Sequence, residues 1–99
     1  MLENLTQQMF SENLNSRFQM HHESSGTIGL ELIQVVDHGS TDTHEQFSLL
    51  FLGPVDGPVI QNVYRVEHDK LGAFDLFVVP IGKDGSGVQY EAVINRFTN

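Results

Sequence analysis

The sequence predicts a mainly β domain, at the margin of α+β because of one short helix near its N-terminus. Only two alanines occur in 99 residues, whereas valine, isoleucine and aromatic residues are abundant. Branched and aromatic side chains favour extended strands over helices. Apolar and polar residues also alternate in several stretches that end in glycine, proline or acidic turns, which is typical of short strands. We therefore expect a single β-rich domain over residues 1–99.

The helix is expected at residues 6–14. Thr6 can cap its N-terminus through the side-chain hydroxyl. Apolar residues recur at helical spacing on one side, at Leu5, Met9, Phe10 and Leu14. Asn13, Asn15 and Ser16 are expected to end the helix.

Six strands are expected after the helix, at residues 17–22, 28–36, 46–52, 60–68, 73–81 and 88–97. The links between the last four are short, and short links join antiparallel neighbours because parallel pairs need long crossovers. Residues 83–87 (KDGSG) are the strongest turn signal, since Asp and Gly accept the backbone angles of tight hairpins. The expected architecture is a six-stranded antiparallel sheet, curled into a small barrel or sandwich, with the helix packed on it or plugging an end.

The composition excludes several classes of function. Five Lys and Arg stand against 13 acidic residues, and the net charge of −8 offers no basic stripe for nucleic acid. The absence of Cys excludes disulfides, zinc–thiolate sites and a thiol nucleophile. The chain begins with neither a basic leader nor an apolar core, and no apolar run approaches a transmembrane span. We expect synthesis in the cytoplasm without a signal peptide and no membrane insertion, while assembly into an extracellular particle stays open.

Several strands carry a second apolar face. Ser48 and Asp75 mark the outer side of their strands, yet apolar residues share that side. The candidate interface consists of Ile33, Val35, Leu50, Leu52, Phe77, Val79 and Val93. Two coverings are open and compatible: the apolar side of the helix, with Met9 and Phe10, or a protein partner. The strand at 17–22, if it lies at a sheet edge, could also pair with a strand of a neighbour.

Candidate metal ligands gather in the polar loop 37–45. Asp37, His38, Asp42, His44 and Glu45 could converge there, but no pair has a spacing fixed on a helix or strand. A solvated polar loop is the favoured interpretation, so no metal site is expected.

Candidate catalytic residues are sparse. Residues 67–69 place Glu67, His68 and Asp69 in succession before a turn, but a triad would need a Ser or Thr near His68. Ser86 lies in a hairpin too short to act as a nucleophile elbow. The glycines match no nucleotide-binding pattern. We expect no enzyme activity and no cofactor.

Four sequence blocks resemble an uncharacterised family of small bacterial domains. The blocks are residues 47–54 (FSLLFLGP), 64–68 (YRVEH), 71–82 (LGAFDLFVVPIG) and 90–96 (YEAVINR). The resemblance covers about residues 5–97, and it brings no catalytic residues to this chain. Genes of this family are associated with neighbours that resemble phage tail-collar and short-fibre proteins. The resemblance therefore implies a subunit or accessory of a tail-like or surface fibre.

The sequence favours a structural or interaction protein that associates through sheet faces or edges. Its expected partners are copies of itself or a tail-collar-like or fibre-like protein. The alternative is a small-ligand-binding or accessory barrel, with a cavity lined by Phe47, Phe51, Phe74 and Tyr90. An enzyme is the third and least favoured class.

Overall fold

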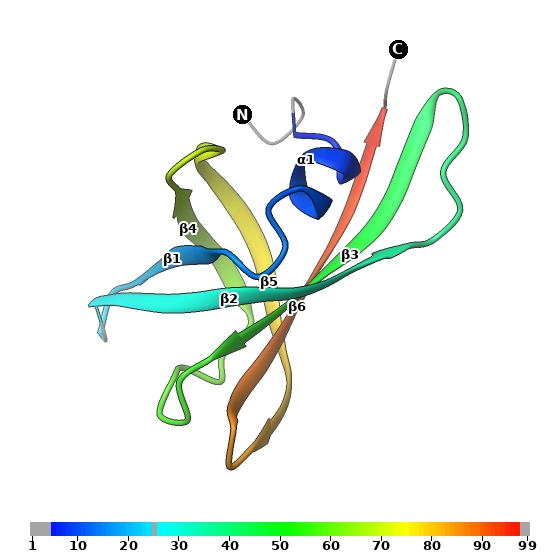
Figure 1. Cartoon of the computed structure of the whole chain (residues 1–99). Helices are drawn as coiled ribbons and strands as arrows, with labels where there is room; N and C mark the ends of the chain where they lie inside the picture. The colour runs from blue at the N-terminus through cyan, green and yellow to red at the C-terminus, as the bar shows by residue number, and fades with distance from the viewer. Residues whose placement is uncertain (1–4, 25, 98–99) are drawn as a thin grey trace.

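A computed structural model describes residues 5–24 and 26–97, and it confirms a mainly β fold with one short helix (Figure 1). The elements are α1 (Gln7–Ser11), β1 (Arg17–His22), β2 (Gly26–Asp37), β3 (His44–Gly53), β4 (Asn62–His68), β5 (Gly72–Asp84) and β6 (Gly87–Phe97). All six predicted strands are present. The strands β2, β3, β5 and β6 extend one to three residues beyond their predicted ends, whereas β4 begins two residues later than predicted. Among the described residues, no helix is long and apolar enough to cross a membrane.

The six strands form one antiparallel sheet that closes on itself as a barrel, in the order β1-β2-β3-β6-β5-β4. The ring closes where β4 returns to β1, through the register pairs Gln19–Glu67, Met20–Val66 and His21–Arg65. Because β1 pairs with β2 on one side and β4 on the other, the prediction that residues 17–22 could form a free sheet edge is wrong.

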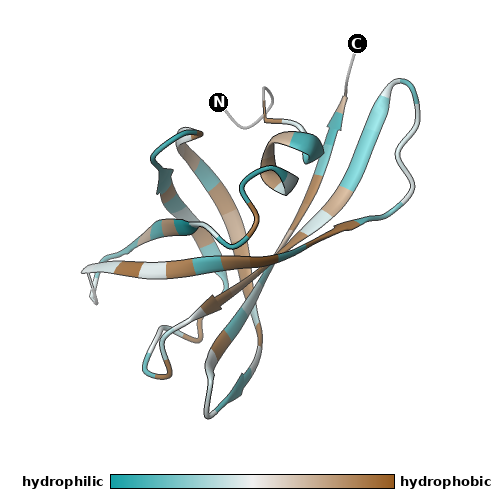
Figure 2. Cartoon of the chain, in the orientation of Figure 1, coloured by the Kyte–Doolittle hydropathy of each residue, from teal (hydrophilic) through white to brown (hydrophobic). Residues whose placement is uncertain are grey.

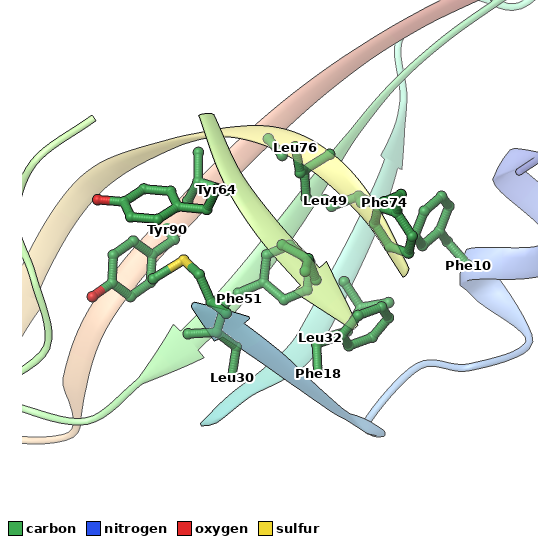
Figure 3. Close-up of a cluster of buried hydrophobic side chains, with 14 of the residues drawn as sticks. Phe10, Phe18, Leu30, Leu32, Leu49, Phe51, Tyr64, Phe74, Leu76 and Tyr90 are labelled. Atoms are coloured by element: carbon green, nitrogen blue, oxygen red, sulfur yellow. The ribbon is translucent and has the colours of Figure 1, made fainter. Parts of the chain in front are cut away.

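Inward-facing side chains from all six strands fill the interior of the ring. Phe18, Leu30, Phe51 and Tyr90 are among the side chains that are completely buried. Figure 3 shows Tyr64 and Tyr90 toward one end of this core and Phe10 with Phe74 toward the other. Alternate residues are therefore buried along β4 and the first half of β5, as the period-two pattern predicts.

The connection between β3 and β4, residues 54–61, lies at the tyrosine end of the core. The hydroxyl of Tyr90 donates a hydrogen bond of 2.7 Å to the carbonyl of Pro58, and Tyr64 donates to the carbonyl of Ile60. A Cβ atom at position 57 would lie 2.6 Å from the Tyr90 hydroxyl oxygen, so Gly57 is required for this close approach. The two tyrosines thereby fix the loop against the ring.

Helix α1 plugs the opposite end of the ring. Its N-terminus is capped as predicted, with the Met9 amide donating to Thr6 Oγ1 at 3.1 Å. Phe10 is fully buried, and its ring centroid lies 5.9 Å from Phe47 and 6.0 Å from Phe74. Figure 1 shows α1 between β5 and the β3–β6 pair. The helix ends at Ser11, three residues earlier than predicted, because the chain continues in turns up to Asn15, whose φ is 66°.

Candidate interaction surface

The exposed apolar residues of the ring lie on its outer face. Figure 2 shows that hydrophobic and hydrophilic positions alternate along the strands. Phe77 and Val93 are 51% and 57% exposed, and Ile33 is 38% exposed. Leu50, Leu52 and Val79 are half-buried on the same side of the sheet. The structure therefore places six of the seven predicted interface residues on the outer face.

Val35 is the exception, because a β-bulge lies between Leu32 and Gln34. Leu32 pairs with Phe51, and the next register pair joins Gln34 with Leu50, so Ile33 is the extra residue. One inserted residue reverses the alternation of all residues that follow it. Val35 consequently pairs with the buried Leu49 and packs against the core. The prediction that Val35 lies on the outer face is wrong.

Helix α1 does not cover the outer face, which was one of the two coverings left open by the sequence. Phe10 points into the ring, and Met9 is partly buried against the same core. Met9 and Phe10 therefore pack against the core inside the ring. The helix plugs an end, which was one of the two predicted positions, and its apolar side is not used on the outer face.

The outer face carries a pair of neighbouring, exposed apolar residues, and one of the two was not predicted from the sequence. Val63 in β4 lies directly opposite Phe77 in β5, and Val63 is 58% exposed. The next outward register pair is Arg65 with Asp75, whose side chains form an exposed ion pair of 3.3 Å. We name Val63, Arg65, Asp75 and Phe77 the β4–β5 patch. The pattern of β4 contains the signal for Val63, since Tyr64 and Val66 fix the inner side.

Polar residues interrupt the outer face toward β3 and β6. Glu91 lies between Leu50 on one side and Val79 on the other, because it pairs with both. Ser48 is almost fully buried on this face, and His38 Nε2 lies 2.5 Å from its hydroxyl oxygen. The ladder between β5 and β6 ends at the pair Val79–Glu91. Val93 lies beyond that end, where the two strands separate.

The candidate metal ligands in the loop at 37–45 contact other residues of the same chain. His38 contacts Ser48, and the ring of His44 stacks on Phe97 at 5.2 Å. Glu45 Oε1 accepts hydrogen bonds from Arg96 at 2.9 Å and from the amide of Gln7 at 3.1 Å. These bonds tie α1 to β3 and β6. Among residues 5–24 and 26–97, no group of three or more His, Cys, Asp or Glu side chains is arranged to hold a metal ion.

Asp37 is held by the turn that follows it. Its Oδ1 accepts hydrogen bonds from the Ser40 hydroxyl at 3.0 Å and from the Gly39 amide at 3.2 Å. These bonds stabilise the carboxylate, so the pKa of Asp37 is lowered, chiefly by Ser40. The Asp37 carboxylate therefore stabilises the turn at residues 37–40.

His68 has a serine partner, which the sequence did not reveal because Ser16 is far away in the chain. Ser16 Oγ lies 2.8 Å from His68 Nε2. The other ring nitrogen, Nδ1, accepts hydrogen bonds from the amides of Lys70 at 3.1 Å and Leu71 at 3.2 Å. An accepting Nδ1 requires the proton of the neutral ring to be on Nε2, which then donates to Ser16.

This arrangement is the reverse of a catalytic pair. A general base must present an unprotonated nitrogen to the serine hydroxyl, whereas Nε2 of His68 already carries its proton. Burial lowers the pKa of His68 and favours this neutral form, against a smaller opposing effect of Asp69. An open hollow of about 460 Å³ adjoins the ring and is lined partly by Arg17, Glu67 and Asp69. The Ser16–His68 contact is a structural hydrogen bond beside that hollow.

The comparisons with known proteins identify a family. A model of the family described as "Domain of unknown function (DUF6916)" matches residues 5–94. No match to the chain was found among curated proteins or among solved structures. The matched range includes all of α1 and β1 to β5 and most of β6. The chain belongs to the DUF6916 family.

Proposed function

We propose that this chain is a non-enzymatic interaction domain, which assembles through its outer sheet face as a subunit or accessory of a bacterial fibre or phage-tail-like structure. One observation carries the proposal. Val63 and Phe77 lie opposite each other on neighbouring strands, and each is more than half exposed. Adjacent exposed apolar side chains of this kind are typical of protein interfaces. The setting in a fibre or tail-like particle comes from the family resemblance of the sequence.

The alternative of a ligand-binding barrel has less support. Phe47, Phe51 and Tyr90 are fully buried, and their neighbours inside the ring are other side chains. Phe10 and Phe18 pack against these phenylalanines, with Phe18 and Phe51 centroids 5.2 Å apart. The aromatic residues that would line a cavity therefore act as core.

Sedimentation velocity tests the proposal, with the wild-type chain alone and mixed with a tail-collar-like fibre protein. We expect a heavier species in at least one of these samples. Phe77→Asp should remove it, since a charge in the middle of an apolar contact must be desolvated. Val55→Asp is the matched control, because Val55 is similarly exposed but lies in the loop at 54–61.

Two results would contradict the proposal. One is a monomer in both samples at about 1 mM, a concentration at which even an association of only about −4 kcal/mol would be detected. The other is a complex that Phe77→Asp and Val55→Asp leave equally intact. Circular dichroism melting of both variants shows that any loss of binding does not come from unfolding.

A further inference from the structure

We propose that the β4–β5 patch is a two-fold symmetric interface between two copies of this chain. The inference rests on the proposed interaction function and names the partner that the patch fits. The register of two strands, the exposure of four side chains and the charge of the patch support this interface.

The register of β4 and β5 makes the patch complementary to itself. Val63 pairs with Phe77, and Arg65 pairs with Asp75 one step further along the same outer face. A two-fold axis that runs parallel to the strands, between β4 and β5, exchanges the two strands without changing the height along them. Val63 then faces Phe77 of the second copy, and Arg65 faces Asp75 of the second copy. Each contact occurs twice, as an isologous interface requires.

The side chains have the exposure and length for these contacts. Val63 and Phe77 both project from the sheet, and the Arg65 and Asp75 side chains are 53% and 64% exposed. Facing sheets pack about 10 Å apart, a distance that side chains from both sides fill together. The apolar pair supplies the buried area, and the charged pair fixes the register of the two copies.

The charge of the patch removes an obstacle to self-association. The chain has a net charge of −8, so two copies repel each other over most of their surfaces. The patch contains one positive and one negative side chain and is neutral overall. The next outward pair on these strands joins Glu67 with Ala73, so the same symmetry places each Glu67 over an alanine. The contact therefore places no two acidic side chains directly opposite each other.

Charge reversal at the two charged positions tests this geometry. Arg65→Glu alone and Asp75→Lys alone each place like charges opposite each other at both contacts of a homodimer. We expect each variant to self-associate at least about tenfold more weakly than wild type, because like charges at an interface suppress pairing. An equimolar mixture of the two variants restores opposite charges at both contacts. We expect this mixture to form a heterodimer with an affinity near that of wild type.

Sedimentation equilibrium of the wild type, each variant and the mixture provides the measurement. Lys83→Glu and Asp56→Lys are the matched controls, because they change the charge equally at exposed positions outside the patch. Both controls should dimerise like wild type. The intramolecular ion pair of Arg65 and Asp75 is exposed, so its loss should change the thermal melting of each variant little.

Three results would overturn the dimer: a wild-type monomer at about 1 mM, dimers that persist in both single variants, or a mixture that stays monomeric. The first and third leave the proposed function standing if wild type still binds the fibre protein and Phe77→Asp abolishes that binding. The proposed function fails under different results. Either wild type forms neither a homodimer nor a complex with the fibre protein, or Phe77→Asp leaves these complexes intact.

Discussion

Ser16 and His68 join two parts of the ring that are distant in the sequence, through the 2.8 Å contact between Ser16 Oγ and His68 Nε2. Ser16 immediately precedes β1, and His68 is the last residue of β4. The same serine hydroxyl also donates a hydrogen bond to the carbonyl of Asn13. The contact therefore fixes the turn after α1 to the seam where the ring closes.

Replacing Ser16 should destabilise the fold. Ser16→Ala removes the acceptor of the Nε2 proton on a nearly buried ring, and an unsatisfied donor costs about 1–3 kcal/mol. We expect the free energy of unfolding in urea to fall by about that amount. Ser24→Ala should change it by less than about 0.5 kcal/mol, since Ser24 is exposed. Equal losses in the two variants would contradict the structural role of Ser16.

The stability of the fold should depend on pH through His68. Burial lowers the pKa of this ring below its usual 6.5, so the unfolded chain binds a proton at a higher pH than the folded chain does. The contribution of His68 is therefore fully present above pH 6.5 and is lost as the pH falls below that value. Urea unfolding of wild type and His68→Gln between pH 5 and 8 measures it. A wild-type slope that His68→Gln leaves unchanged would rule out this origin.

Tyr90 should resist ionisation in the folded chain. Burial raises its pKa to about 12, with a smaller effect from Tyr64. The chain has two tyrosines, so the phenolate absorbance of a Tyr64→Phe variant reports Tyr90 alone. Burial remains in this variant, so we expect Tyr90 to titrate well above the usual 10, and an inflection near 10 would contradict the buried position. The unfolded chain loses this proton first, so stability should decline as the pH rises above 10.

The bulge in β2 gives opposite expectations for two neighbouring apolar residues. Val35→Asp should lower the free energy of unfolding by about 2 kcal/mol or more, because Val35 packs against the core. Ile33→Asp should cost less than about 1 kcal/mol, because Ile33 is exposed at the bulge. Thermal melting of both variants checks the difference. The reverse order would mean that β2 alternates without interruption.

Local patterns were sufficient to predict the strands, because the strands bury alternate residues in one common core over much of their length. The sequence placed β1 at its observed bounds, and it predicted the β5–β6 turn, where the Ser86 amide donates to Asp84 Oδ1 at 2.8 Å. The N-terminal cap at Thr6 was also predictable, since capping depends on the nearest three residues. Each of these features depends only on residues that are close together in the sequence.

The features that were not predictable depend on contacts between distant segments. The bulge at Ile33 follows from the pairing of β2 with β3, and alternation within β2 alone gives no sign of it. The pairing of β1 with β4 removes the expected edge, and it needs the whole ring to exist. The role of Ser16 depends on its contact with His68 in β4, which is distant from it in the sequence. In the candidate interface, Val35 was misplaced because of the bulge in β2. Val63 was missed although the alternation within β4 contains its signal.

The order of strands in the ring also determines when the chain can fold during synthesis. β6 lies between β3 and β5, so the wall of the core is incomplete until residues 87–97 have left the ribosome. Before that moment Phe10 and Phe18, made early, have no finished interior in which to pack. Such non-local pairing slows folding and leaves apolar rings exposed in the interval. Completion of β6 therefore ends the interval in which the core side chains of the nascent chain are exposed to intermolecular contact.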